Sequence, residues 1–350
     1  MTQIPVAVLG ATGAVGQRFV SLLAAHPWFK VVALAASDRS AGQPYAEACR
    51  WVLNEAMPEY AREMRIVPVD PGSIPAKILF SALPTNMAKD VEPQFAQAGF
   101  AVCSNASAYR RADDVPLLLP EVNADHIQLV KVQREQRGWK GCILTNPNCT
   151  STGLTVALKA LDDAFGVEKA FVVSLQALSG AGYPGVPSLD IIDNVIPNVN
   201  GEEDKVEWEP RKMLGTYGAG RVELSGIAIS AHTNRVAVSD GHTVCASVEL
   251  SRPADPEAAA RAMSAYLAPA SARDLPSSPR PALQVRTEAD RPQPRLDRLT
   301  GNGMTTVVGR VRRDPLLHVK FVVLSHNTIR GAAGGSIYNA ELLVNENLLR

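Results

Sequence analysis

The first half of the chain alternates short apolar runs with segments that repeat apolar residues at helical spacing. An apolar run at residues 4–9 (IPVAVL) stops at Gly10, a helical pattern follows through residue 26, and a second apolar run covers residues 30–37. The alternation continues with expected strands at 77–83, 100–105 and 141–146 and expected helices at 86–98 and near 124–137. Runs that are apolar throughout are typical of strands buried on both faces. The pattern therefore predicts an α/β fold with a Rossmann-like, doubly wound parallel sheet.

A different pattern begins after the helix expected to follow residue 149. Longer runs with one apolar face are expected to be strands at 169–180, 220–234, 242–250 and 317–325. Such runs are typical of a mainly antiparallel sheet covered on one face, here by helices expected near 187–195 and 255–267. The stretch 268–300 is rich in Pro, Arg and Ser, which favours a long loop or an excursion at a sheet edge. The second half is thus expected to be an α+β domain.

Composition and charge limit the classes of protein to which the chain can belong. The chain has 350 residues, of which 46% are apolar and 20% charged, as is ordinary for a globular protein large enough for two domains. Thirty-five basic residues balance thirty-five acidic ones, which argues against nucleic acid or an anionic membrane as the main partner. No apolar run is long enough to span a bilayer, and the first residues lack a basic start and a cleavage site. We therefore expect a cytoplasmic protein.

The five cysteines do not indicate a disulfide framework or a metal site. They are odd in number and scattered, and no pair has the CxxC spacing of a zinc site. We expect no metal. Cys103, Cys142 and Cys245 lie inside strand-like runs and are expected to be buried, small apolar residues.

The glycines that follow the first apolar run indicate nucleotide binding. In GATGAVG, Gly10, Gly13 and Gly16 stand three apart between an expected strand and an expected helix. Helix N-termini offer free amide donors and a partial positive charge, and glycines let a pyrophosphate approach them. Around Asp38, the second strand ends in AASDRSAG, where Ser37, Arg39 and Ser40 suit the 2′-phosphate of NADP. Asp38 itself suits the ribose hydroxyl of NAD. NADP is favoured, and NAD stays open.

A candidate nucleophile lies at the start of the helix after residue 148. Cys149 follows an Asn-Pro-Asn turn, and the dipole of a helix N-terminus lowers a thiol pKa. The alternative is a buried structural cysteine, so a partner base is needed. The run NRVAVSDGHTV supplies His242 as a proton carrier and Arg235 as a bidentate carboxylate binder. His232 is a rival base, although packing at a strand end is the better interpretation of it.

Two further clusters suit anions. Arg110 and Arg111 lie in a polar loop, SNASAYRRADD, after an expected strand. The segment GEEDKVEWEPRKML places Glu202, Lys205, Glu209 and Lys212 at helical spacing. Without further information, the second cluster is interpreted as a solvated helix face with i,i+4 ion pairs.

Together these motifs resemble the aspartate-β-semialdehyde dehydrogenase family, in the branch found in archaea and fungi. The resemblance runs along essentially the whole chain, in family order, through GATGAVG, SNASAYR, PNC, QALSGAGYPG, GEEDK, NRV…DGH and NTIRGAAGGSI. Seven motifs in order are far more specific than any one of them. The segment 268–300 carries no family motif, so its role stays open.

The resemblance implies a role for each matched residue. Cys149 would be the nucleophile, His242 the general acid–base, and Gln176 would help to position the thioacyl group. The implied substrate contacts are Arg235 for the α-carboxylate, Glu202 for the amino group, and Arg110, Asn148 and Lys205 for phosphate. The implied cofactor contacts are Gly10, Thr12, Gly13, Ala14, Val15 and Gly16 at the phosphates, Ser37, Arg39 and Ser40 at the adenosine ribose, and Ser179, Gly180 and Gly334 at the nicotinamide half.

The implied activity is the reversible, NADPH-dependent reductive dephosphorylation of β-aspartyl phosphate to aspartate β-semialdehyde, a step in lysine, threonine, methionine and isoleucine biosynthesis. The implied organisation is a dinucleotide-binding domain, 1–149 with 328–350, and a catalytic and dimerisation domain, 150–327, in a homodimer or homotetramer. An acyl-CoA reductase resembling malonyl-CoA reductase is the alternative enzyme. N-acetyl-glutamyl-phosphate reductase matches less well, and a non-catalytic nucleotide sensor would have no use for Cys149.

Overall fold

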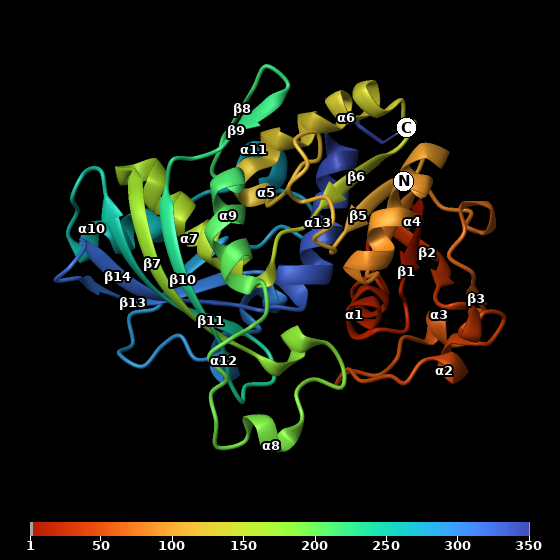
Figure 1. Ribbon diagram of the computed structural model, residues 1–350, viewed down its shortest axis with the longest axis horizontal. Coiled ribbons are helices and arrows are strands. Elements are labelled where there is room, and N and C mark those ends of the chain that lie inside the picture. Colours follow the sequence, from red (N-terminus) through yellow and green to blue (C-terminus); the bar gives the residue numbers. More distant parts are fainter. Residues whose placement is uncertain (1–2, 350) are drawn as a thin grey trace.

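The structure is a computed structural model that describes residues 3–349, and this part of the chain folds around two large sheets placed side by side (Figure 1). The first sheet has the strand order β3-β2-β1-β4-β5-β6, and all its pairs are parallel. Its strands are β1 (Ile4–Leu9), β2 (Phe29–Ala35), β3 (Ile66–Val67), β4 (Ile78–Ser81), β5 (Ala101–Ser104) and β6 (Cys142–Thr145). The predicted parallel, doubly wound sheet is confirmed.

Both faces of the first sheet are buried, as its continuous apolar runs predict. Along β1, Val6 and Val8 pack into one apolar cluster, and Ala7 and Leu9 pack into another on the opposite face. Helices cover these clusters, with α4 on one side and α1 and α13 on the other. The helices of this half are α1 (Ala14–Leu22), α2 (Tyr45–Ala48), α3 (Glu59–Arg62), α4 (Thr85–Ala98), α5 (Pro120–Asn123), α6 (Leu129–Arg137) and α13 (Gly334–Asn345), with short 3₁₀ turns η1 (Asp38–Ser40), η2 (Pro71–Ser73) and η3 (Ala124–Gln128).

The second sheet has the order β10-β7-β11-β14-β13-β12. Its β7–β11, β11–β14 and β14–β13 pairs are antiparallel, whereas β10–β7 and β12–β13 are parallel. The strands are β7 (Val167–Gln176), β10 (Ala228–Arg235), β11 (His242–Leu250), β12 (Leu283–Val285), β13 (Thr306–Arg313) and β14 (Val319–Ser325). The sheet is therefore mixed, with a mainly antiparallel centre.

The helices that cover this sheet differ in part from the expected ones. The cover is α7 (Cys149–Phe165), α9 (Glu202–Met213) and α10 (Pro256–Ser264). The expected helix at 187–195 shrinks to the single turn α8 (Ser188–Ile191), which lies on an extended loop away from the sheet (Figure 1). Leu189 and Ile192 there are exposed, so this segment does not cover the sheet.

The expected strand at 220–234 is broken in two. Ala219 and Gly220 both have positive φ, the conformation of a two-residue type I′ turn. This turn pairs β8 (Thr216–Gly218) with β9 (Arg221–Glu223) in a separate hairpin, and β10 begins only at residue 228. The stretch 268–300 contains short elements, namely α11 (Ala270–Arg273), β12, α12 (Pro294–Asp297) and the start of the 3₁₀ turn η5 (Thr300–Gly303).

One face of the second sheet is open in the single chain. Phe171, His232 and Cys245 are exposed there, on β7, β10 and β11. The expectation that Cys245 is buried is thus wrong for the isolated chain, because the side chain points to the uncovered face, whereas Cys103 and Cys142 are buried as expected. Among residues 3–349, no helix combines the length and hydropathy that crossing a bilayer requires.

Helix α7 joins the two halves and places residue 149 between them. It begins directly after β6 of the first sheet, yet it packs against β7, β11 and β14 of the second. Eleven of its seventeen residues are buried. The N-terminus of α7 therefore lies where the carboxyl ends of the parallel strands meet the second sheet, the usual place for a site in such folds.

Candidate active site

The backbone around Cys149 is fixed by the residue before it. Asn148 is the N-cap of α7, and its Oδ1 accepts hydrogen bonds from the N–H groups of Thr150 (2.9 Å) and Ser151 (3.2 Å). Its backbone N–H donates to Glu209 Oε2 at 2.6 Å. Cys149 is consequently the first residue of the helix, held by an anchored cap.

His242 lies against the cysteine. Its Nε2 is 3.2 Å from Cys149 Sγ, although the two residues are 93 positions apart in the sequence. The Ala177 N–H donates to His242 Nδ1 at 3.0 Å, so Nδ1 is an acceptor. In the neutral ring the proton is then on Nε2 and faces the sulfur. The structure thus brings the predicted nucleophile and acid–base together and defines the tautomer.

Burial shifts both of these groups toward their neutral forms. It raises the pKa of the Cys149 thiol to about 12; Glu202 adds to this rise, while Arg110 and Arg235 oppose it. Burial also lowers the pKa of His242 to about 3, and the positive charge of Arg235 acts in the same direction. The depressed thiol pKa expected from the helix start is therefore wrong for the ligand-free protein, because desolvation outweighs the helix dipole.

A cleft of about 620 Å³ opens beside Cys149. Its lining residues from the glycine turn are Thr12, Gly13, Ala14, Val15 and Gly16. Gly16 must be glycine, because a Cβ there would lie 2.2 Å from the Gly10 carbonyl oxygen. The cap residue Gly13 has no side chain to occupy the first amides of α1. These residues fit a dinucleotide pyrophosphate, since the helix N-terminus is free and nothing blocks the approach.

Other predicted cofactor residues lie outside the cleft wall. Gly10 shapes the turn from behind, with φ +71° and a Cβ position 2.8 Å from the Ala82 carbonyl oxygen. Ser37, Arg39 and Ser40 lie in and beside η1, at the carboxyl end of β2, and Arg39 is exposed. Gly334 does not line this cleft; it lines a separate small cavity.

The GAAGG segment reaches the cleft through other residues than Gly334. Gly331 and Ala332 line it, and a Cβ on Gly331 would lie 2.7 Å from Cys149 Cβ. In the ligand-free protein the motif thus borders the cleft at Gly331 and Ala332, and the cofactor contact of Gly334 stays a prediction. Residues 329–333 form a π-helical turn, η6 (Ile329–Ala333), and Gly334 follows it as the first residue of α13.

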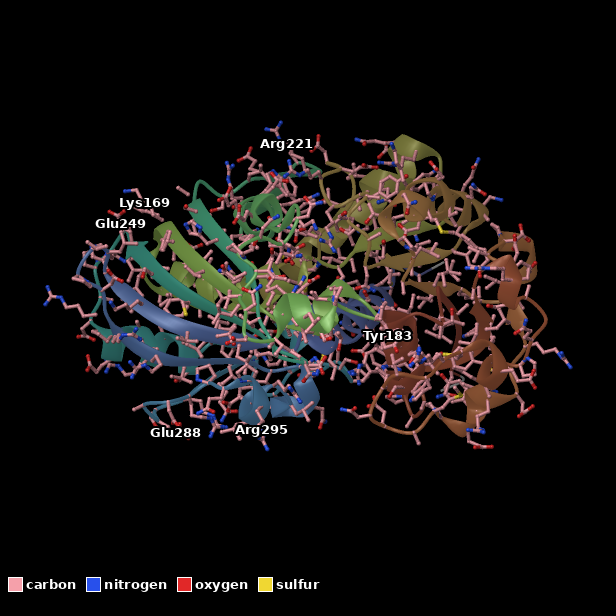
Figure 2. All side chains as sticks on the ribbon, turned by 60° about the horizontal axis from the view of Figure 1, so that its bottom comes forward. Lys169, Tyr183, Arg221, Glu249, Glu288 and Arg295 are labelled. Carbon is pink, nitrogen blue, oxygen red and sulfur yellow. The ribbon has the colours of Figure 1, made fainter. Side chains whose placement is uncertain are left out.

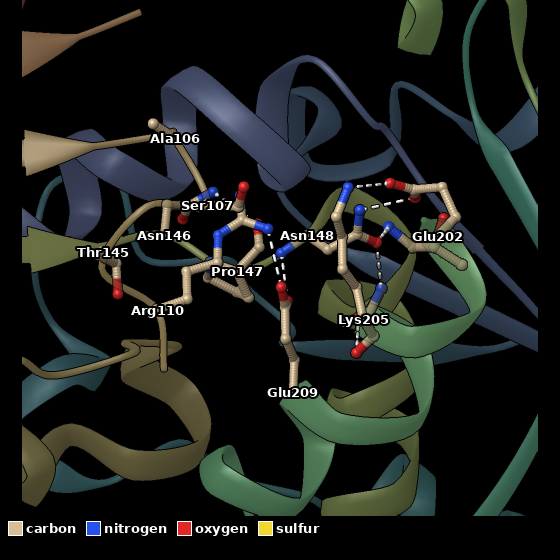
Figure 3. Close-up of polar contacts among 12 residues, drawn as sticks. Ala106, Ser107, Arg110, Thr145, Asn146, Pro147, Asn148, Glu202, Lys205 and Glu209 are labelled. Carbon is tan, nitrogen blue, oxygen red and sulfur yellow. Dashed lines mark hydrogen bonds and ion pairs between the residues drawn. The ribbon is translucent and has the colours of Figure 1, made fainter. Parts of the chain in front are cut away.

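Three of the predicted substrate contacts, Glu202, Lys205 and Asn148, meet at the start of α9 (Figure 3). Glu202 Oε1 accepts from Lys205 Nζ at 2.8 Å, and its Oε2 accepts from Asn148 Nδ2 at 2.7 Å. Gln176 Nε2 lies 3.4 Å from the same oxygen. Glu202, Lys205, Asn148 and Cys149 all line the cleft. A carboxylate and an ammonium therefore face the space beside the thiol.

Two further residues of α9, Glu209 and Lys212, contact Arg110 and the loop that contains it. Glu209 is buried and accepts from Arg110 Nη1 at 2.8 Å, and Figure 3 shows it between Arg110 and Asn148. Lys212, one turn further, donates to the carbonyl oxygens of residues 110, 112 and 115 at 2.7–2.9 Å. Burial lowers the pKa of Lys212 to about 8. The interpretation of this cluster as a solvated face is wrong.

Arg235 is placed behind the loop that borders the cleft. Its Nη1 donates to the Ala177 carbonyl at 2.7 Å, and burial lowers the pKa of its guanidinium. A Cβ on Gly180 would lie 2.8 Å from Arg235 Nη1 and 3.0 Å from His242 Cε1. Gly180 thus allows the loop to pack directly on both predicted site residues. His232 lies on the open face of the sheet, where its ring meets Phe171 edge-on.

The cleft has walls that the sequence motifs did not identify as contacts. These are chiefly Arg50, Thr85, Asn105, Ser107, Asn327 and Thr328. Arg50 stacks over the ring of Tyr183, 5.1 Å from its centroid, and Tyr183 lies where the two halves meet (Figure 2). Asn327 Nδ2 donates to Ser179 Oγ at 2.8 Å. Asn327 belongs to the NTIRGAAGGSI motif, so this motif could have identified it as a residue of the cleft.

Comparison with known proteins identifies the family. Sequence models of the semialdehyde dehydrogenase NAD-binding domain and dimerisation domain match residues 5–130 and 158–330. An aspartate-semialdehyde dehydrogenase from Archaeoglobus fulgidus is 54% identical over 98% of this chain and 99% of its own length. The chain belongs to the aspartate-semialdehyde dehydrogenase family. A second family member, from Schizosaccharomyces pombe, is 46% identical over 98% of this chain and 99% of its own.

Solved structures of the aspartate-semialdehyde dehydrogenase family have the same fold. The enzyme from Candida albicans with NADP has a TM-score of 0.91 and 42% identity over 99% of this chain and all of that one. Aspartate semialdehyde dehydrogenase II from Vibrio cholerae, complexed with ASA, has a TM-score of 0.78 and 27% identity over 99% of both chains. The predicted family, fold class and enzyme class are confirmed, and the acyl-CoA reductase alternative is not favoured.

Proposed function

We propose that this chain catalyses the reversible, NADPH-dependent conversion of β-aspartyl phosphate to aspartate β-semialdehyde and phosphate. The observation that carries the proposal is the contact of 3.2 Å between Cys149 Sγ and His242 Nε2 beside a cleft that holds both a glycine turn and an anion cluster. A helix N-terminus suited to a dinucleotide and a thiol paired with an imidazole are the parts that a thioacyl hydride transfer needs.

The covalent step forms one bond and breaks one. Cys149 first releases its thiol proton to water, because His242 Nε2 already carries a proton and donates it toward the sulfur. The thiolate Sγ then attacks the acyl carbon, a C–S bond forms, and the C–O bond to phosphate breaks with release of phosphate. Lys205 lines the cleft, and Arg110 keeps a buried Nε without a hydrogen-bond partner among residues 3–349. These two cations are the proposed ligands of the phosphate, with Asn148 beside them.

The nicotinamide supplies the hydride when NADPH is bound. The oxyanion that develops on the thioester carbon needs a fixed donor near Sγ. The N–H groups of Thr150 and Ser151 are occupied by Asn148, so the amide of Cys149 itself is the proposed donor. The Nε2–H of His242 faces the sulfur and is placed to hold a proton there as the C–S bond breaks.

The remaining roles follow the positions of the side chains. Arg235 is proposed to bind the α-carboxylate, which requires the loop around Gly180 to give way by a small movement. Glu202 is proposed to bind the amino group, and Gln176, beside it, to position the thioacyl group. For the cofactor, residues 12–16 are proposed to hold the pyrophosphate, Ser37, Arg39 and Ser40 the 2′-phosphate, and Ser179, Gly180 and Gly331 the nicotinamide half.

We also propose a division into two domains, 1–149 with 328–350 and 150–327. The packing of α13 on β4 and β5 supports returning the C-terminal segment to the first domain. The match to a dimerisation domain indicates that the chain forms oligomers. A homodimer through the open face around Phe171 would bury apolar side chains that the single chain leaves in water. A tetramer would need a second contact surface.

The test is an assay with aspartate semialdehyde, NADP and phosphate, from which each is omitted in turn. The proposal predicts NADPH formation only when all three are present. Formation that needs coenzyme A instead of phosphate would favour an acyl-CoA reductase. Cys149→Ala should abolish the rate while cofactor binding, measured by fluorescence, is retained; a chain indifferent to this change would be a nucleotide sensor.

A further inference from the structure

The stretch 268–300, which carries no family motif, is fastened along the edge of the second sheet. Its strand β12 pairs in parallel with β13, and the Arg286 N–H continues this ladder to the Val308 carbonyl at 2.7 Å. Beyond this point the chain turns outward, so that Glu288 and Arg295 lie at the edge of the molecule (Figure 2). It then returns through α12.

Asp297 fixes the returning part of the stretch. Its side chain is fully buried and accepts from Arg286 Nη2 (2.9 Å), Arg291 Nε (2.6 Å) and the Gln293 N–H (2.7 Å). Two guanidinium groups thus share one buried carboxylate. Breaking this cluster is costly, because it would leave a buried charge without a partner of opposite sign. A helix of four residues such as α12 is not stable by itself, so this cluster sets its position.

Arg298, the next residue, reaches the turn that precedes His242. Its Nη1 donates to Ser239 Oγ at 3.0 Å and to the Asp240 carbonyl oxygen at 3.3 Å. Gly241 has a φ of +98°, and a Cβ there would lie 3.3 Å from Arg298 Cβ and 3.4 Å from Pro294 Cβ. Pro294, the first residue of α12, and Arg298, the residue after its end, therefore lie directly against the turn 239–241.

The position of this turn determines where the imidazole lies, because His242 is the first residue of β11. The turn has two other attachments: the Gly241 N–H donates to Asn327 Oδ1 at 2.8 Å, and the Ser179 N–H donates to the Ser239 carbonyl at 3.1 Å. Both come from segments that border the cleft. Arg298 is the attachment from outside the cleft, and the only side chain of the 268–300 stretch for which the described residues show a hydrogen bond to this turn.

We propose that Arg298 is a positioning residue: it clamps the turn 239–241 from outside, and the Asp297 cluster holds Arg298 in place, so that the imidazole of His242 stays aligned with Cys149. This inference rests on the proposed catalytic roles of Cys149 and His242. It gives the unassigned stretch a function, namely a brace between the edge strand β12 and the catalytic histidine.

The experiment compares Arg298→Ala and Arg298→Lys with the matched control Arg295→Ala. Arg295 is an exposed arginine three residues earlier, and its side chain makes no hydrogen bond or ion pair among the described residues. Misplacement of a catalytic group by a fraction of an ångström to one ångström costs about ten- to a hundredfold in kcat, which is the loss expected for Arg298→Ala, with KM values changed less than about threefold. Arg298→Lys should recover most of the rate, because both hydrogen bonds come from one nitrogen and an ammonium can donate both.

A second measurement separates positioning from general stability. Iodoacetamide labelling of Cys149 at neutral pH should slow in Arg298→Ala, because the imidazole no longer donates to the sulfur, and stay unchanged in Arg295→Ala. The unfolding temperatures of the two variants should agree. If Arg298→Ala does not fold, Ser239→Ala is measured in its place. The double variant, Ser239→Ala with Arg298→Lys, should then lose the rate that Arg298→Lys alone retains.

The outcomes are distinguishable. A kcat of Arg298→Ala within about twofold of the unsubstituted protein, the range of ordinary surface changes, would overturn the inference. An equal loss in Arg295→Ala would also overturn it. An unsubstituted protein that is folded but inactive with aspartate semialdehyde, NADP and phosphate would instead refute the proposed function.

Discussion

A buried carboxyl next to the cleft gives a sharp prediction about pH and stability. Glu92 on α4 is fully buried, and its Oε1 accepts from Ser104 Oγ at 2.7 Å. Ser81 and Ser104 are register partners at the carboxyl ends of β4 and β5, and the residues that follow them, Ala82 and Asn105, line the cleft. Burial raises the pKa of Glu92 from 4.5 to about 7, and the hydrogen bond from Ser104 opposes this rise only in part.

The magnitude follows from proton linkage. A carboxyl whose pKa is higher in the folded protein than in the unfolded chain holds its proton more tightly when folded. Below pH 4.5 the Glu92 carboxyl is protonated in both the folded and the unfolded state, so it does not reduce the free energy of unfolding. Between pH 4.5 and 7 the free energy of unfolding falls by about 1.4 kcal/mol per pH unit, and above pH 7 the loss is constant at about 3 kcal/mol.

Glu92→Gln should remove this loss. The amide oxygen keeps the bond from Ser104, and the amide nitrogen can donate to Ser81 Oγ, which has no hydrogen-bond partner among residues 3–349. Unfolding temperatures of variant and unsubstituted protein are compared from pH 5 to pH 9, with the exposed Glu135→Gln as the control for net charge. At about 2–4 °C per kcal/mol, the variant should gain about 6 °C or more relative to the unsubstituted protein between these limits. A temperature difference that does not depend on pH would refute the reasoning.

Three further predictions concern the site and the oligomer. Glu202→Gln should speed iodoacetamide labelling of Cys149 in the ligand-free protein, because it removes a negative charge that raises the thiol pKa; an unchanged rate would contradict this. Arg39→Ala should weaken NADPH binding, measured by fluorescence titration, by tenfold or more relative to its effect on NADH, as expected for a lost charge-assisted bond of about 1.5 kcal/mol or more; equal losses would mean that another residue binds the 2′-phosphate. Phe171→Asp should shift the protein toward the monomer in sedimentation experiments and expose Cys245 to labelling, whereas a dimer that persists would place the interface elsewhere.

The sequence could predict what depends on local patterns. Continuous apolar runs identified the parallel strands, and the spacing of Gly10, Gly13 and Gly16 identified the turn after β1, because a close backbone approach tolerates no side chain. Cys149 and His242 were found as separate motifs, and the structure places them in contact across the two halves. These features depend on short stretches of the sequence, so they can be identified without knowledge of the tertiary contacts.

What could not be predicted depends on which neighbour a residue meets. Helical spacing places Glu202, Lys205, Glu209 and Lys212 on one face of α9, but it does not tell whether that face meets water or protein. The structure turns it inward, where Glu209 and Lys212 hold the loop of Arg110. The ionisation of buried groups is equally non-local, because it is set by desolvation and by charges from distant segments.

The protonation of Cys149 shows how these two kinds of information combine. The position of the thiol at a helix start is local, and it favours the thiolate. The packing of α7 between the halves buries the same sulfur and outweighs that effect, so the ligand-free protein keeps a thiol beside a neutral imidazole. Glu202 is the largest charged contributor to this state, and it is also the proposed ligand of the substrate amino group. An ammonium bound there would offset the part of the rise in thiol pKa that Glu202 adds to the larger effect of burial, which ties the reactivity of Cys149 to the presence of its substrate.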